Sequence, residues 1–292
     1  MKSTNWHQAT LNKAASLLPW ESPTTDTKDL AETIRHMIET FTPEDKEETD
    51  SAGHKLIRAA IKIPITVDDI PFTTNEMREA IKGMNKKKSP GEDGITSDIL
   101  YCAFRLLPKS TTALYNCCLR TACFPRRRKT AIIIPIIKSG KETSSDVAKY
   151  RPISLISTLA EVLEKVLMNR IMHHMHSHNV LSQNLHGFTP QTSTVDAVMD
   201  LQHYAQMSME EGQYVALLSL DLQGVFDATW WPGILFSLKT LKCPRSLYNL
   251  CGSYFNGRSA VLILNTRKEE KDDKHRVYPR IGVWTRLLEH PV

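Results

Sequence analysis

One segment constrains the fold of this 292-residue chain more than any other: residues 217–231, LLSLDLQGVFDATWW. Its apolar run predicts a buried strand that ends near Asp221, and a carboxylate beside a packed core is costly unless it is paired or binds a cation. If the strand continued, Asp227 would lie about 20 Å from Asp221, too far to share one ion. Asp221 is therefore the candidate for metal chemistry and Asp227 for a structural role. A helix cap or an ion pair would also explain Asp221 from this segment alone.

Helix signals are frequent along the chain. Thr73 and Glu76 have capping-box spacing at the start of one helix, and Thr96 or Ser97 can cap the next. Apolar residues at helical spacing predict an amphipathic helix within residues 156–178. The main helices expected from these signals cover residues 73–84, 98–107, 111–124, 156–178, 195–211 and 234–241.

Three strands are expected besides the one that ends near Asp221. Residues 129–138, KTAIIIPIIK, are rich in β-branched side chains, and Pro135 indicates an edge strand because proline cannot donate to a ladder. A second strand is expected at 149–155, after a polar turn, and a third at the end of 256–264. The polar stretch 43–53 and the charged stretch 268–275, which contains Asp272-Asp273, are predicted to be loops.

Composition excludes several classes of protein. The sequence has no apolar run near 18 residues and no apolar signal region at its N-terminus, so we expect no membrane span and an intracellular protein, nuclear or cytoplasmic, that is not secreted. The six cysteines lie mostly among apolar helical residues without zinc-site spacing, which predicts buried thiols and neither disulfides nor structural zinc. The length is sufficient for two or three units.

Positive charge is concentrated in one block. Residues 81–140 carry 12 Lys and Arg against 3 Asp and Glu, although the whole chain has a net charge of only +5. Such a block can neutralise a phosphate backbone, or it can form a solvated basic face. The candidate nucleic-acid-binding residues are Lys86, Lys87, Lys88, Arg126, Arg127, Arg128 and Lys129.

Four motifs, in this order, resemble the reverse transcriptase of non-LTR retrotransposons of the long interspersed element type. They are KKSPGEDGI (87–95), the segment 134–171 with its YRPISL core, HGFTPQTSTVDAV (186–198) and SLDLQGVFDATWWPGIL (219–235). The resemblance covers roughly residues 75–265. It implies an α+β, helix-rich, right-hand polymerase fold: a linker or adaptor over 1–74, fingers over 75–200, a partial palm over 201–292, and no thumb.

The resemblance also implies roles for particular residues. Asp221 would be the first palm carboxylate that holds catalytic Mg²⁺, and Phe226 would disfavour a 2′-hydroxyl on the incoming nucleotide. Lys138 and Arg151 would contact the triphosphate of a dNTP, since lysine and arginine suit phosphate oxygens. The implied partners are an RNA template, a DNA primer and dNTPs, and the oligomeric state is left open.

The sequence departs from the family in its palm. The family has an aromatic-Ala-Asp-Asp hairpin after the first aspartate, whereas the adjacent aspartates here are Asp68-Asp69 and Asp272-Asp273. RIGVWTRLLEHPV, at the end of the chain, resembles an altered form of the family's G-x-P-Q-G-S loop. We therefore expect a fragment that is inactive by itself, because two Mg²⁺ ions need bridging carboxylates. The alternatives are a non-catalytic nucleic-acid-binding remnant and an unstable product of a decayed element.

Two other features suggest chemistry without requiring it. The four histidines between residues 173 and 178 could be a metal tract, but they end a helix and are expected to be exposed. Trp230-Trp231 is expected to pack in the core rather than to stack on bases.

Overall fold

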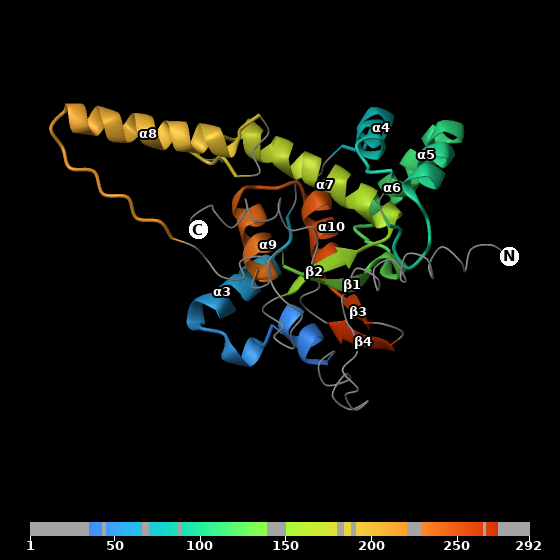
Figure 1. Ribbon diagram of the computed structural model, residues 1–292. Coiled ribbons are helices and arrows are strands. Elements are labelled where there is room, and N and C mark those ends of the chain that lie inside the picture. Colours follow the sequence, from blue (N-terminus) through green and yellow to red (C-terminus); the bar gives the residue numbers. More distant parts are fainter. Residues whose placement is uncertain are drawn as a thin grey trace.

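The computed structural model describes residues 35–42, 45–65, 70–86, 89–138, 150–179, 184–187, 191–220, 229–264 and 267–273, the last range and residues 137, 263 and 264 by backbone only. The described chain is rich in helices around a small mixed sheet (Figure 1). This agrees with the expected α+β class. No helix among the described residues is long and apolar enough to cross a membrane.

The sheet has the strand order β2-β1-β3-β4. β1 (Thr130–Ile137) pairs antiparallel with β2 (Tyr150–Leu155), and its first half pairs parallel with β3 (Arg258–Leu264). The prediction that β1 is an edge strand is therefore wrong for residues 130–133. β1 pairs with β3 only as far as Ile133. Pro135 lies beyond that point, where β2 is the one described neighbour of β1, so its missing N–H breaks no pairing with β3.

A fourth strand replaces a predicted loop. β4 (Arg267–Asp273) pairs antiparallel with β3 across its whole length, although its sequence, RKEEKDD, has low β-propensity. It is one of the two edge strands of the described sheet, and charged residues are common on edge strands because they discourage pairing with other chains. The sequence-based loop assignment failed because backbone pairing with β3 outweighs local propensity.

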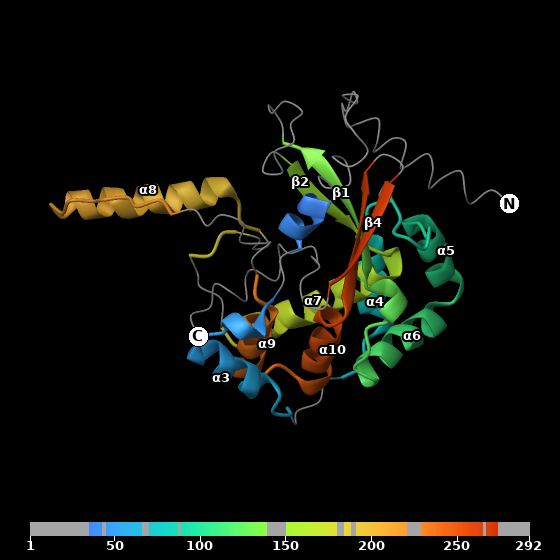
Figure 2. The ribbon, with the colours of Figure 1, turned by 90° about the horizontal axis from the view of Figure 1, so that it is seen from below.

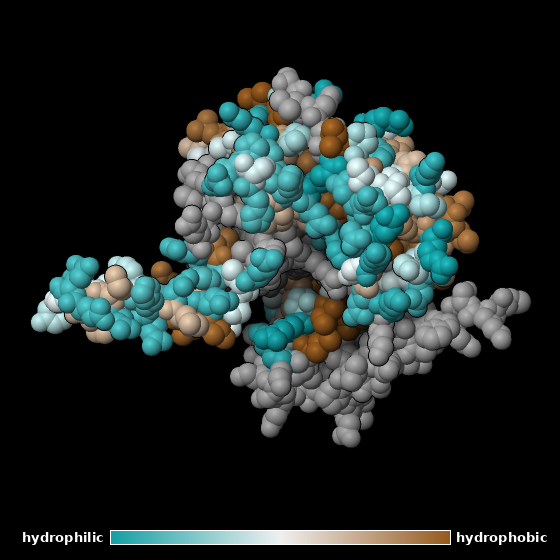
Figure 3. All heavy atoms as spheres, turned by 90° about the horizontal axis from the view of Figure 1, so that it is seen from above, coloured by the Kyte–Doolittle hydropathy of each residue, from teal (hydrophilic) through white to brown (hydrophobic). Residues whose placement is uncertain are grey.

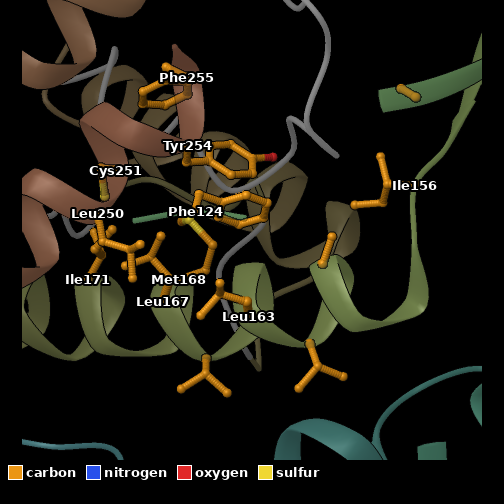
Figure 4. Packing of buried hydrophobic residues seen from close by; sticks show 14 of the residues in the cluster. Phe124, Ile156, Leu163, Leu167, Met168, Ile171, Leu250, Cys251, Tyr254 and Phe255 are labelled. Atoms are coloured by element: carbon orange, nitrogen blue, oxygen red, sulfur yellow. The ribbon is translucent and has the colours of Figure 1, made fainter. Parts of the chain in front are cut away.

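The core forms around α7 (Thr158–Ser177). Leu163, Leu167 and Ile171 of α7 are buried and pack near Phe124 and residues of α10 (Arg245–Phe255), as Figure 4 shows. The extent of α7 confirms the predicted helix. The prediction that this helix is amphipathic is wrong, because even its acidic residues Glu161 and Glu164 are buried. α10 was not foreseen from the sequence.

Two of the helices near the sheet begin at the expected caps. α4 (Thr74–Lys82) opens with the capping box of Thr73 and Glu76, and the Thr96 side chain accepts from the Ile99 N–H at the start of α5 (Ser97–Leu106). α6 (Pro108–Arg120) follows directly, with proline in its first turn. Figures 1 and 2 show α4, α5 and α6 together on one side of the molecule.

The N-terminal part of the described chain is packed into the fold. Residues 35–41 are helical and bury Met37 and Phe41 in the core. After η1 (Glu47–Thr49), α3 (Ala52–Ile61) packs on α9 (Trp231–Thr240). Arg58 forms ion pairs with Asp45 and Asp50, and this helix was not foreseen from the sequence.

Both tryptophans of the Trp230-Trp231 pair contribute to packing, as predicted. The Trp230 indole donates to Asp45 at 3.2 Å, and Arg58 lies over its ring. Trp231 is buried and stacks on Phe255, with ring centroids 5.2 Å apart.

The thiols differ from the sequence-based expectation. All six cysteines are free. Cys243 and Cys251 are buried as expected, but Cys102, Cys117 and Cys123 are exposed, which corrects the prediction of generally buried thiols. The three exposed cysteines lie in or next to the outer helices α5 and α6, where apolar neighbours in sequence do not ensure burial.

α8 (Thr194–Glu210) confirms the predicted helix and projects away from the rest of the described chain (Figures 1 and 2). The segment that follows it corrects a prediction. Residues 213–220 form no strand, and Leu217, Leu218 and Leu220 are exposed. The expected buried strand ending at Asp221 is therefore wrong for its described part, because no described strand pairs with this segment and its leucine side chains are exposed.

Candidate nucleotide and nucleic-acid site

The β1–β2 hairpin brings two predicted phosphate-binding residues onto one face of the sheet. Ile136 lies opposite Arg151 in the antiparallel register, so both point to the same face. Lys138 follows Ile136 by two residues, and strand alternation places it on that face as well. Arg151 and Ile136 are exposed and Lys138 is half-buried. The hairpin therefore carries an arginine at the start of β2 and a lysine directly after the end of β1, and both kinds of side chain can bind phosphate oxygens.

The opposite face of the hairpin is packed against the core. Ala131, Ile133 and Tyr150 are buried, and alternation places them on the side away from Arg151. Burial of this face leaves the face that carries Ile136 and Arg151 exposed, which fixes the side of the sheet to which Arg151 points.

The base of the hairpin is held by the SPGEDGI turn. The Ser157 hydroxyl, directly after β2, donates to Asp93 at 2.6 Å, and the Thr158 hydroxyl donates to the Ile95 carbonyl at 2.6 Å. Arg128 forms an ion pair with Asp93 and donates to the Ser157 hydroxyl at 3.0 Å. These contacts join residues 93–95, η2 (Arg126–Arg128) and the start of α7.

Gly91 allows the close approach of this turn. A Cβ atom at Gly91 would lie 2.5 Å from the Ser157 backbone nitrogen and 2.7 Å from the Ile156 carbonyl carbon. Because both contacts are with backbone atoms, a side chain at this position requires the turn or the hairpin base to shift.

The basic residues of the 81–140 block have different surroundings. Arg126 and Arg127 are exposed, and Lys86 is exposed with its ammonium 5.6 Å from the centroid of the Tyr101 ring. Arg128 instead holds Asp93, and burial lowers its pKa. Lys87 and Lys88 lie outside the described residues. Nucleic-acid binding by these residues stays a prediction.

Lys129 and Arg258 form a cationic pair that the sequence did not reveal. Lys129 donates to the Asn256 carbonyl at 2.8 Å, and burial, together with the nearby Arg258, lowers its pKa. Arg258 is 2% exposed and lies over the Tyr254 ring, 4.5 Å from its centroid. The parallel pairing of β1 with β3 brings these residues together across more than a hundred positions, so no local pattern predicts their proximity.

The predicted metal site lies outside the part of the chain that can be described. Asp221, Phe226 and Asp227 all fall in the range 221–228. Among the described residues, no group of three or more His, Cys, Asp or Glu could hold a metal ion. The roles of Asp221 and Phe226 therefore stay predictions.

The histidine tract is mostly exposed, as predicted. His173, His176 and His178 are exposed. His174 is half-buried, and its Nε2 lies 2.7 Å from the Leu241 carbonyl oxygen, which links the end of α7 to the end of α9.

Comparison with known proteins gives a consistent result. Residues 137–279 match the family described as "Reverse transcriptase (RNA-dependent DNA polymerase)". The chain is 34% identical over 192 residues to the "RNA-directed DNA polymerase from mobile element jockey" of Drosophila funebris, which covers 64% of this chain and 20% of that protein. A second relative is the "Retrovirus-related Pol polyprotein from type-1 retrotransposable element R1" of Bradysia coprophila, to which the chain is 31% identical over 213 residues. This match covers 73% of this chain and 20% of the relative. The chain spans about a fifth of the length of these curated relatives.

Proposed function

Because the chain belongs to the reverse transcriptase family, in the group carried by non-LTR retrotransposons, we propose that it forms the nucleotide- and template-binding part of an RNA-directed DNA polymerase. In this proposal residues 75–200 are the fingers and the palm begins near residue 201. The substrates are dNTPs, an RNA template and a DNA primer, inside the cell, in the nucleus or the cytoplasm. The observation that carries the proposal is the shared face of Lys138 and Arg151 on the β1–β2 hairpin.

Lys138 and Arg151 bind the triphosphate in this proposal. Arg151 is held in the ladder opposite Ile136, and Lys138 follows Ile136 by two residues, so in this proposal both cations approach an anion from the same side of the hairpin. Arginine supplies a planar fork for two phosphate oxygens and lysine a compact charge. Asp221 would hold Mg²⁺, which in this family stabilises charge on the reacting phosphate, and Phe226 would lie beneath the sugar.

Nucleotide binding by the hairpin is testable without polymerisation. We expect Lys138→Ala and Arg151→Ala each to weaken binding of a fluorescent dNTP by roughly tenfold, as measured by fluorescence anisotropy, because each removes a charge-assisted contact of about 1.5 kcal/mol. Lys109→Ala removes an exposed cation on α6 and is the matched control. Equal effects of the control and the hairpin variants would refute the assignment.

The 292-residue chain alone does not extend a primer in this proposal. Its adjacent aspartates are Asp68-Asp69, upstream of the hairpin, and Asp272-Asp273, whose backbone lies in the outermost strand β4. Neither follows the aromatic and alanine residues of the family's hairpin. A primer-extension assay in Mg²⁺ with the purified chain is expected to show no synthesis, and template-directed extension would overturn this.

A second candidate function is nucleic-acid binding without catalysis. It is favoured by the exposure of Arg126, Arg127 and Lys86 in the basic block. We expect RNA binding to weaken steeply as salt rises, because phosphate contacts release counterions. Binding that is unchanged between low and physiological salt would exclude phosphate contacts by these residues.

A further inference from the structure

Three of the six cysteines lie close together in the sequence, at the end of α6. Cys117 and Cys123 are exposed and Cys118 is half-buried. Exposure alone assigns them no role, because Figure 3 shows hydrophobic residues scattered over the body of the molecule among hydrophilic ones, and single exposed apolar side chains are common on protein surfaces. In the described parts of the chain no group of three or more His, Cys, Asp or Glu could hold a metal ion, so the three thiols do not form a zinc site. The backbone, however, brings two of them together.

α6 ends in a motif that places residues 118 and 123 side by side. The Ala122 N–H donates to the Leu119 carbonyl at 3.2 Å, and the Cys123 N–H donates to the Cys118 carbonyl at 3.0 Å. Ala122 is in the left-handed region, with φ 49°. These are the two hydrogen bonds and the left-handed residue of a Schellman motif, in which the side chains of the two residues joined by the outer hydrogen bond commonly contact each other. In this chain both of those residues are cysteines.

The backbone separation of the two cysteines suits a disulfide. Standard bond lengths and the 3.0 Å hydrogen bond keep the Cα atoms of Cys118 and Cys123 within about 7 Å of each other. Disulfides join Cα atoms that are about 4.4–6.8 Å apart. The thiols also interact electrostatically, because burial raises the pKa of the Cys118 thiol and the nearby Cys117 and Cys123 raise it further. The Cys123 thiol makes a weak contact with the Phe124 carbonyl oxygen at 3.9 Å, so a change of rotamer can turn it towards Cys118.

Both ends of the motif are anchored to the rest of the protein. Cys118 packs against the core. Phe124, directly after Cys123, is buried in the core (Figure 4), and its N–H donates to the Ser253 hydroxyl at 2.9 Å. A thiol held in this way reacts with its neighbour in an intramolecular step, which is much faster than an encounter between free molecules. The Lys129 ammonium group interacts favourably with a Cys123 thiolate, and the thiolate is the form that peroxides oxidise.

We propose that Cys118 and Cys123 form a reversible oxidation site, at which hydrogen peroxide converts the two thiols into a disulfide across the end of α6. The exposed Cys123 reacts first: its thiolate attacks one peroxide oxygen, the O–O bond breaks, and the other oxygen leaves as hydroxide and takes up a proton to form water. Cys118 then loses its proton, its sulfur attacks the sulfur of the Cys123 sulfenic acid, and the S–O bond breaks with release of a second water. Two electrons pass from the thiols to the peroxide. A small thiol such as glutathione reverses the reaction and is itself oxidised to a disulfide, which returns the site to the reduced state of this structure.

Tryptic digestion makes the proposed disulfide directly visible. Cleavage after Lys109, Arg120 and Arg126 places Cys118 in the peptide 110–120 and Cys123 in the peptide 121–126, so only a disulfide can hold these two peptides together. The purified 292-residue chain is treated with hydrogen peroxide, remaining thiols are blocked with N-ethylmaleimide, and the denatured chain is digested and measured by mass spectrometry. We expect the linked peptide pair after oxidation of the folded chain, and we expect its loss when dithiothreitol is added before the blocking step.

Substitutions separate this pair from unspecific oxidation of exposed thiols. Cys118→Ser and Cys123→Ser should each abolish the linked peptide pair, and position 123 is exposed, so the second variant does not disturb the core. Cys117→Ser is the matched control, because it removes the adjacent exposed thiol from the same peptide, and it should retain the link. Absence of the link from the oxidised parent, its persistence in Cys118→Ser, equally abundant links to the exposed Cys102, or formation only in urea would each overturn the proposal.

Discussion

Glu76 is expected to be a pH-dependent link between the start of α4 and α7. Its carboxylate completes the capping box by accepting from the Thr73 N–H at 2.8 Å, and it also forms an ion pair with Arg170 of α7. Arg170 in turn donates to the carbonyls of Ile70 and Pro71, both at 2.9 Å. Loss of the Glu76 charge therefore loosens the helix start and the chain segment before it together.

The magnitude follows from the pKa of Glu76. Partial burial of its carboxyl group alone would raise the pKa, but hydrogen bonds from Arg170 and Thr73 outweigh burial and lower it from 4.5 to about 2. A shift of this size corresponds to about 3 kcal/mol at most. Because 34% of the Glu76 side chain is exposed, solvent screening reduces this value, and we expect Glu76→Gln to lower the free energy of unfolding by about 1 to 1.5 kcal/mol at pH 7.

The sign of the pH dependence is fixed by the lowered pKa. The stabilisation is fully present above pH 4.5, the ordinary pKa, and is lost as the pH falls towards 2, where the folded carboxylate is protonated as well. Urea denaturation followed by circular dichroism at pH 7, 4.5 and 3 should show the difference between parent and Glu76→Gln shrinking at the lowest pH. Glu79→Gln is the control, since its exposed pair with Lys82 is at 3.5 Å. A pH-independent difference, or equal effects of the two variants, would refute this reasoning.

Two further predictions concern the hairpin base and the thiols. Gly91→Ala should destabilise the protein by about 1 to 3 kcal/mol in thermal denaturation, since its Cβ would meet backbone atoms of the hairpin base. Gly53→Ala in α3 is the control: its Cβ would make only an ordinary contact, 3.7 Å from the Ser51 hydroxyl, so this variant should be slightly stabilised or unchanged. Iodoacetamide should modify the exposed Cys102 rapidly in the native state but should modify Cys251 only after unfolding. The reason is that burial, with Cys243 nearby, raises the pKa of the Cys251 thiol well above its ordinary value. Mass spectrometry of digests measures the labelling, and rapid labelling of Cys251 in the native state would contradict the prediction.

Local signals in the sequence predicted local structure well. The capping box of Thr73 and Glu76 and the cap at Thr96 are present, because each depends on residues within one helical turn. The span of α7 was also foreseen, but its buried polar side was not. Glu164 is buried because elements from distant parts of the sequence cover α7. The apolar periodicity of one helix cannot predict such coverage.

The strands predicted around residues 129–138, 149–155 and 256–264 are present as β1, β2 and β3, but two other predictions that depend on pairing partners failed. β4 is a strand because β3 supplies a backbone ladder, and residues 213–220 are not a strand because no described strand lies beside them. Within the candidate site, Lys138 and Arg151 came from the family resemblance, and the β1–β2 register adds that they share a face. Arg258 was missed because it approaches Lys129 only through the parallel pairing of β1 with β3.

The core crosses the proposed boundary between fingers and palm. α7, within the proposed fingers, packs its Leu167 and Ile171 near Leu250 and Cys251 of α10, in the proposed palm (Figure 4). β1 pairs with β3 across the same boundary, and the Phe124 N–H donates to the Ser253 hydroxyl at 2.9 Å. The proposed fingers and the proposed palm therefore share one core and are not separate packing units. Since the hairpin that carries Lys138 and Arg151 is part of the same sheet as β3, its orientation depends on residues on both sides of position 200.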